Sequence, residues 1–160
     1  HGHVPDDDVV LFLPPDGVKM INSSPAYLHE QVIEYLRHQQ MCRLKVTGRC
    51  MNPLIQKGDW VTIEPFSINQ PPRQGDIVLI NRVNDFAIHR LLKIKGNEVI
   101  TRGDWSISID PPFKRNDILG KVIIIEKNKR KIQLSHPFWQ MINKFLLLMG
   151  LLFEKLKSKE

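Results

Sequence analysis

The sequence predicts an α+β fold that consists mainly of antiparallel strands. Between residues 43 and 125 it contains six strand-length runs in which β-branched and other apolar residues are concentrated. Turns rich in Gly, Pro, Asn and Asp separate these runs, and no helical pattern occurs between them. Helical spacing occurs before and after this region. We therefore expect a coiled β-sandwich or barrel-like core, preceded by one helix and followed by an amphipathic helix.

The N-terminal part, residues 1–42, is predicted to contain one strand and one helix. The apolar run Val9–Leu13 ends at a Pro-Pro-Asp-Gly turn. Ser23 or Ser24 before Pro25 is typical of an N-cap followed by a first-turn proline, so we expect a helix from Pro25 to Gln40. One side of this helix carries Tyr27, Leu28, Gln31, Val32, Tyr35 and Leu36.

Residues 43–134 form the predicted β-core. Its expected strands are Leu44–Val46, Trp60–Ile63, Ile77–Ile80, Phe86–Ile94, Val99–Thr101 and Ile118–Ile125. Strands this close together, joined by turns alone, are typical of antiparallel sheets.

Residues 135–160 return to helical spacing. One face carries Phe138, Met141, Ile142, Phe145, Leu148, Met149, Leu152, Phe153 and Leu156, and the other carries Lys144, Glu154 and Lys155. This wide apolar face favours contact of residues 138–157 with a membrane surface or a partner protein over simple core packing. The longest apolar candidate, Phe138–Phe153, is shorter than the ~20 apolar residues of a membrane-spanning helix and contains Asn143 and Lys144. We therefore expect no full transmembrane span.

The charge is distributed unevenly along the chain. The formal net charge is +6, and the segment from Lys114 to the end contains eleven Lys and Arg residues and four Asp and Glu residues. Such a basic segment can attract an anionic surface or simply be solvated. Basic and aromatic residues do not interleave, so we expect no nucleic-acid binding. The acidic start predicts no signal peptide, which leaves a membrane-associated or a cytoplasmic location open.

Cysteine and histidine spacing gives no metal signature. The two cysteines do not form a CxxC motif, and the six histidines form no HExxH motif. We therefore predict no structural zinc and no cofactor. Cys42 is expected to be a small buried residue, although a Cys42–Cys50 disulfide is conceivable.

Four short stretches carry the candidate chemistry. In chain order they are Gly48-Arg49-Cys50-Met51-Asn52-Pro53 with Lys57-Gly58-Asp59, then Gln74-Gly75-Asp76-Ile77-Val78, then Ile88-His89-Arg90, and finally Thr101-Arg102-Gly103-Asp104 with Asp110-Pro111 and Leu119-Gly120-Lys121-Val122. In this order they resemble the boxes of signal peptidase I and related S24/S26 peptidases, from about Leu44 to Ile125. The family pattern is Gly-x-Ser-Met-x-Pro, a Gly-Asp turn, a Gly-Asp-x-Val strand start, a catalytic box, and then Gly-Asp and Leu-Gly-x-Val.

The resemblance implies an endopeptidase that binds an extended, leader- or signal-like peptide in a shallow groove and cuts it beside small residues. Bacterial signal peptidases and self-cleaving repressors have a general-base lysine in the catalytic box. This sequence has His89-Arg90 there, which resembles the archaeal and endoplasmic-reticulum branch that uses histidine and aspartate. Cys50 stands where the family has its serine nucleophile.

The catalytic roles follow from thiol and imidazole chemistry. Cys50 must become a thiolate to attack a carbonyl, and His89 can take its proton and return it to the leaving amine. A carboxylate then orients the imidazole. Asp104 is our first choice for that carboxylate, with Asp110 close behind.

Three neighbours of the nucleophile have expected binding roles. Backbone N–H groups of Arg49 and Cys50 are candidates for an oxyanion hole. Met51 is expected to line the groove floor, and Pro53 to fix the turn that presents the nucleophile.

The cysteine leaves three explanations open. It is a working nucleophile, a degenerate site in a peptide-binding module, or an engineered replacement that traps a complex. A dimerising, self-cleaving repressor half is a further alternative, but the lysine base and a helix-turn-helix are missing from the sequence.

Overall fold

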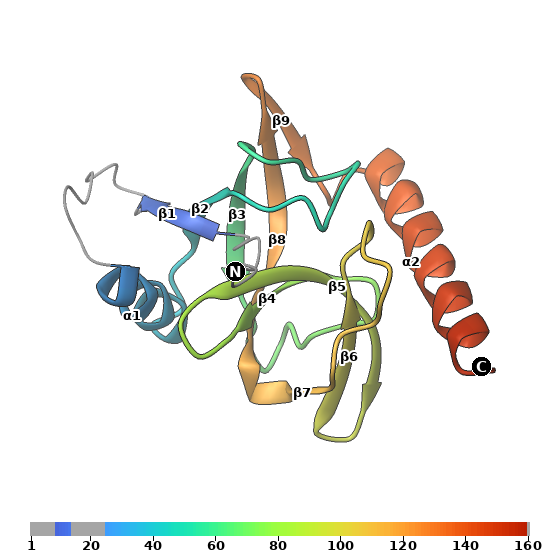
Figure 1. Ribbon diagram of the computed structural model, residues 1–160. Helices are drawn as coiled ribbons and strands as arrows, with labels where there is room; N and C mark the ends of the chain where they lie inside the picture. Colours follow the sequence, from blue (N-terminus) through green and yellow to red (C-terminus); the bar gives the residue numbers. More distant parts are fainter. Residues whose placement is uncertain (1–8, 14–24, 160) are drawn as a thin grey trace, which may run out of the picture.

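The computed structural model describes residues 9–13 and 25–159, and its main feature is one curled antiparallel sheet (Figure 1). The strands are β1 (Val9–Leu13), β2 (Cys42–Val46), β3 (Trp60–Pro65), β4 (Ile77–Asn81), β5 (Phe86–Lys95), β6 (Glu98–Arg102), β7 (Phe113–Lys114), β8 (Ile118–Lys127) and β9 (Arg130–Gln133). The helices are α1 (Pro25–Arg37) and α2 (Pro137–Lys157), with a 3₁₀ turn at Arg115–Asp117. The α+β prediction, with a helix on each side of an antiparallel core, is confirmed.

The sheet does not follow chain order at its centre. Its strand order is β1-β2-β3-β8-β4-β5-β6-β7, and β9 pairs with β8. The late strand β8 therefore lies between β3 and β4, with Ile63 opposite Val122 on one side and Val78 opposite Lys121 on the other. The two halves of the sheet are joined through this strand.

Strands β4 and β5 are buried on both faces. Alternate residues of β4 belong to different apolar clusters, with Ile77 and Leu79 in the larger one and Val78 and Ile80 in the smaller one. This division follows from the two-residue period of a strand, which sends successive side chains to opposite faces. Phe86 to Leu92 in β5 are all buried, so β5 can hold polar side chains in dry surroundings on either face.

Helix α1 covers the larger cluster beside β1 and β2 (Figure 1). Its Val32 and Leu36 are each 2% exposed. It ends at Arg37, three residues before the predicted end, because Gln39 has a φ of 59°, a left-handed conformation typical of a helix C-terminus. The Pro14-Pro15 turn and the Ser23 or Ser24 cap lie outside the described residues.

Helix α2 lies at the opposite side of the sheet, beside β5 and β6 (Figure 1). Its contacts with the sheet include Asn143, Gly150 and Glu154, which are not part of the predicted apolar face, and Phe153, which is part of it and packs on Arg102. Among the described residues, no helix is long and apolar enough to cross a membrane.

Two short strands were not predicted. β7 has two residues, and β9 is the charged segment Arg-Lys-Ile-Gln, so neither produces an apolar alternation. They form because each pairs with an existing strand, β7 with β6 and β9 with β8.

Candidate active site

Cys50 lies in the turn region between β2 and β3. The turn is held by the N–H of Asn52, which donates to the carbonyl of Arg49 at 3.1 Å, and by that of Ile55, which donates to Met51 at 3.1 Å. The Cys50 thiol is partly exposed and lies 3.7 Å from the carbonyl oxygen of Ile88. The turn therefore brings the thiol to the backbone of β5, immediately before His89.

His89 is bound to a carboxylate. Its Nδ1 lies 2.5 Å from Oδ2 of Asp110, and the same oxygen accepts the hydroxyl of Thr101 at 2.6 Å. The N–H of Asp110 donates to the carbonyl of Thr101 at 3.0 Å. His89 is 8% exposed and Thr101 is fully buried. Asp110 is thus fixed at both its backbone and its side chain by one buried threonine.

Asp104 is bound to Arg90 instead. Its two carboxylate oxygens accept Nε and Nη2 of Arg90, each at 2.8 Å, in a two-point contact. Nη1 of Arg90 donates to the carbonyl of Gly75 at 3.1 Å and also to Oδ1 of Asn143 in α2. Arg90 is 0% exposed. The structure therefore brings Asp110, and not our first choice Asp104, to His89.

The separation of the two aspartates follows from strand geometry. His89 and Arg90 are consecutive in β5, so their side chains leave the strand on opposite faces. Asp104 and Asp110 both belong to the segment between β6 and β7. That segment supplies one carboxylate to each face.

Gly103 allows this segment to pass directly against Cys50. A Cβ at Gly103 would lie 2.7 Å from the carbonyl oxygen and 2.9 Å from the Cβ of Cys50. The N–H of Trp105 donates to that same carbonyl at 2.8 Å. The backbone of the nucleophile candidate is therefore clamped by the loop that carries both aspartates.

The other predicted neighbours of Cys50 differ in their placement. Arg49 and Pro53 are exposed, and the Asn52–Pro53 peptide is cis. Met51 was expected on a groove floor, but it is only 2% exposed and its Sδ accepts the N–H of Asp104 at 3.5 Å. Because Met51 packs in the core, it supports the loop that carries Asp104 and offers almost no surface to a ligand.

A family model described as Peptidase S24-like matches residues 17–102. The chain belongs to the Peptidase S24-like family. The match covers more than half of the 160 residues. None of the curated proteins compared with the chain is significantly similar to it. Membership in this peptidase family supports a peptidase-type hydrolase.

The matched region of this S24-like chain contains Cys50 and His89 but ends at Arg102. Asp104 and Asp110 lie beyond it. The S24/S26 resemblance recognised in the sequence is thus supported at the level of the family.

Burial shifts the pKa values of two titratable groups, Cys42 in β2 and the partly buried Arg102 in β6. Burial raises the pKa of the Cys42 thiol to about 12, so this cysteine stays protonated at neutral pH. Neither Cys42 nor Cys50 is in a disulfide. Burial also lowers the pKa of Arg102, although the charges of Asp104 and Asp110 oppose that shift. An arginine nevertheless stays charged in proteins.

Metal-binding capacity can be judged from the side chains that lie together. Within residues 9–13 and 25–159, no group of three or more His, Cys, Asp and Glu side chains is arranged to hold a metal ion.

Three residues of the site had no assigned role in the sequence. Thr101 and Gly103 lie within the quoted boxes, where the alternation of β6 and the glycine itself were the available signals. Asn143 interrupts the apolar C-terminal helix, and a polar residue there is the signal for a buried partner.

Proposed function

We propose that this chain is an endopeptidase in which Cys50 is the nucleophile, His89 the general base and Asp110 the carboxylate that orients His89. The observation that carries the proposal is the short contact of His89 with Asp110 beside a thiol that reaches the Ile88 carbonyl. Membership in the S24-like family supplies the general reaction, hydrolysis of a peptide bond.

The protonation state follows from the partners of the imidazole. An ionised Asp110 can only accept hydrogen bonds, so the Nδ1 of His89 must carry the proton that Asp110 receives. In the neutral imidazole the lone pair is then on Nε2. Nε2 is the atom that would remove the proton from the Cys50 thiol.

The proposed reaction has two balanced halves. Cys50 loses its proton to His89, its sulfur forms a bond to the substrate carbonyl carbon, and the amine leaves with the proton that His89 returns. A water then loses a proton to His89 and attacks the thioester, and the proton returns to the Cys50 sulfur as the acid product leaves. Backbone N–H groups of Arg49 and Cys50 are our candidates for stabilising the oxyanion.

The substrate that we propose is an extended, leader- or signal-like segment. Trp105 and Ile107, on the loop that clamps Cys50, are 68% and 85% exposed. Apolar side chains so exposed beside a reactive thiol offer a contact surface to the apolar part of such a peptide.

The test is cleavage of a proteome-derived peptide library, with new termini mapped by mass spectrometry. We expect the wild-type chain and a Cys42→Ala control to generate one set of termini, and Cys50→Ala to generate none. Cleavage by Cys50→Ala at the same sites would exclude Cys50 as the nucleophile.

The same library distinguishes a peptide-binding module from an enzyme. A module would retain library peptides without producing termini, and Cys50→Ser would not change that behaviour. If Cys50→Ser cleaves peptides that the wild-type chain does not cleave, the site requires a serine nucleophile and Cys50 makes it inactive.

A further inference from the structure

Helix α2 is attached to the sheet through one face, on which Trp139 and Leu146 pack against the larger apolar cluster beside a few polar and small residues. Nδ2 of Asn143 donates to the carbonyl of Gly75 at 2.9 Å, and Glu154 forms an ion pair with Lys93 at 2.7 Å. Between these points Gly150 is buried, and a Cβ there would lie 2.7 Å from Cδ2 of Leu92. The orientation of the helix about its own axis is therefore fixed.

This orientation leaves a continuous apolar stripe on the outside of α2. Its seven side chains are each about half exposed or more, with Met149 at 49% and Leu148 at 64%. Their spacing of three or four residues places them on one side of the helix. This outer stripe consists of Phe138, Met141, Phe145, Leu148, Met149, Leu152 and Leu156. At about 1.5 Å per residue, the helix and its stripe extend for about 30 Å.

The charges beside the outer stripe are all positive. Lys144 lies one helical turn from two stripe residues, and Lys155 lies one turn from Leu152, and both are exposed. Lys157 and Lys159 follow at the C-terminal end. The single carboxylate within Pro137–Lys157 is Glu154, which is bound to Lys93 on the attached face.

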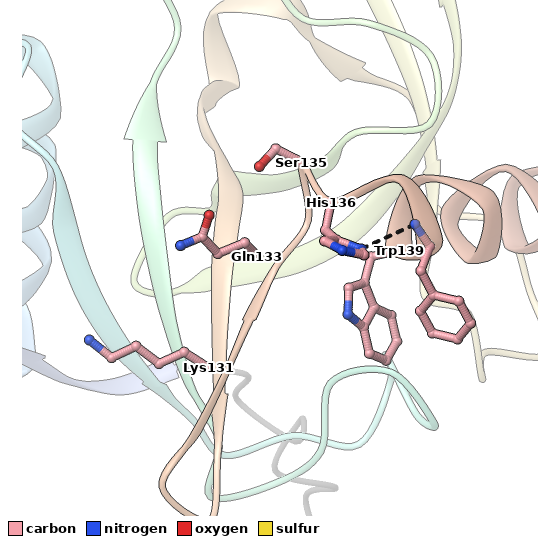
Figure 2. A pocket seen from close by; sticks show the side chains of 6 residues that line it. Lys131, Gln133, Ser135, His136 and Trp139 are labelled. Atoms are coloured by element: carbon pink, nitrogen blue, oxygen red, sulfur yellow. Dashed lines mark hydrogen bonds between the residues drawn. The ribbon is translucent and has the colours of Figure 1, made fainter.

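The stripe begins at a pocket between β9 and α2. Figure 2 shows Lys131 and Gln133 on the strand side of this pocket and His136 and Trp139 at the helix start. Nδ1 of His136 accepts the N–H of Phe138 at 3.3 Å, which holds the first stripe residue at the pocket. The exposed ammonium group of Lys131 lies 3.7 Å from Oε1 of Glu126 and retains further N–H donors toward solvent at this end.

We propose that the outer stripe lies in the headgroup region of an anionic lipid bilayer, with α2 parallel to the membrane plane. A helix that presents an apolar stripe bordered by lysines gains both from burial of the stripe and from attraction to anionic headgroups. The proposal depends on α2 alone and is independent of the chemistry at Cys50.

The charge pattern argues against a second copy of the chain as the occupant. Two outer stripes packed against each other would align Lys144 and Lys155 of both copies along the seam, and neither copy has a carboxylate there. Like charges beside a helix–helix seam destabilise it, whereas anionic headgroups would neutralise the same lysines.

The test is flotation of the full chain with phosphatidylcholine vesicles and with vesicles that contain about 30 mol% phosphatidylserine. We expect binding to the phosphatidylserine vesicles and at least about tenfold weaker binding to phosphatidylcholine alone. Phe145→Gln/Leu152→Gln should lower the binding at least about tenfold. Lys144→Gln/Lys155→Gln should remove most of the preference for phosphatidylserine.

The matched control is Ile68→Gln/Val83→Gln, which removes apolar side chains that are 94% and 91% exposed outside α2. It should bind vesicles as the wild-type chain does. Circular dichroism checks that all variants remain folded. The proposal is overturned if the wild-type chain does not float, or if the Phe145/Leu152 variant floats like the control. It is also overturned if the wild-type chain sediments as a dimer that the Phe145/Leu152 variant converts to a monomer.

Discussion

His89 and Arg90 are consecutive residues of β5, yet each is bound to a different aspartate of the segment after β6. His89 contacts Asp110 at 2.5 Å, and Arg90 contacts Asp104 through two bonds of 2.8 Å. The first pair is next to a partly exposed thiol, and the second is in the interior beside α2. We therefore expect the two carboxylates to have separable effects, one on reactivity and one on stability.

Asp110→Asn should mainly lower the catalytic rate, whereas Asp104→Asn should mainly lower the stability of the fold. Asp110→Asn should lower kcat roughly 10²- to 10⁴-fold, because an amide no longer fixes the tautomer of His89. Asp104→Asn leaves the buried Arg90 charge unpaired and should lower the free energy of unfolding by about 3–5 kcal/mol. Library cleavage and urea unfolding measure the two effects.

The control for Asp104→Asn is Asp85→Asn, which breaks the partly exposed Arg82–Asp85 pair of similar geometry. It should cost no more than about 1 kcal/mol. Equal destabilisation by the two variants would contradict the structural role of Asp104.

Iodoacetamide should label Cys50 and not Cys42. With a pKa of about 12, the thiolate fraction of Cys42 at pH 7 is only roughly one in 10⁵. His89→Ala should slow the labelling of Cys50 by about tenfold or more, because no base then accepts the thiol proton. His38→Ala, at an exposed position just after α1, is the matched control. Mass spectrometry of the labelled peptides reads the result, and identical rates for the two histidine variants would contradict the pairing.

Gly103→Ala should damage the site more than the fold as a whole. The added Cβ would lie 2.5 Å from Oγ of Ser106, which can rotate, and 2.7 Å from the Cys50 carbonyl, which cannot. We expect a loss of about 1–3 kcal/mol and slower labelling of Cys50.

Gly96→Ala is the corresponding control, since Gly96 has a φ of 60° and nothing lies within 4 Å of the added Cβ. It should cost about 1 kcal/mol from its left-handed backbone, with wild-type labelling of Cys50. A wild-type labelling rate in Gly103→Ala would show that the close contact does not control the thiol.

The stability of the fold should carry a pH-dependent contribution from Asp76. Burial raises the pKa of this carboxyl above its usual value, although the N–H of Arg73 and nearby cationic side chains oppose the shift. The folded state therefore binds a proton more tightly than the unfolded state. The contribution is fully present below about pH 3.9 and is lost as the pH rises through the folded-state pKa.

Urea unfolding of the wild-type chain and of Asp76→Asn, from about pH 3 to 7, isolates this contribution. The wild-type free energy of unfolding, minus that of the variant, should fall as the pH rises. A difference that rises with pH would mean that the carboxylate is favoured in the fold.

Much of the fold could be predicted from local pattern. Alternation located β2, β3, β6 and β8, and continuous apolar runs located β4 and β5, because one or both faces of these strands are buried. The order of the short boxes predicted that Cys50 and His89 belong to one site. β9 escaped prediction because Ile132 is its single apolar residue, and pairing with β8 supplies the rest of its stabilisation.

The choice between Asp104 and Asp110 could not be made from the sequence. It depends on which face of β5 each residue meets and on the hydroxyl of Thr101, and both are tertiary relationships. The attached face of α2 was equally hidden. It combines polar, small and charged residues with apolar ones such as Leu146, and apolar periodicity does not single out a mixed face of this kind.

The central position of β8 has a consequence for the order of synthesis. Cys50 follows β2, and His89 is in β5, and these strands belong to the two sheet halves that β8 joins. Every residue of the His89–Asp110 contact and of the Cys50 turn leaves the ribosome before β8 does. The two halves of the sheet can reach their final alignment only when residues 118–127 have inserted between β3 and β4. A nascent chain should therefore remain without an assembled thiol–imidazole site until nearly its whole sheet has been synthesised.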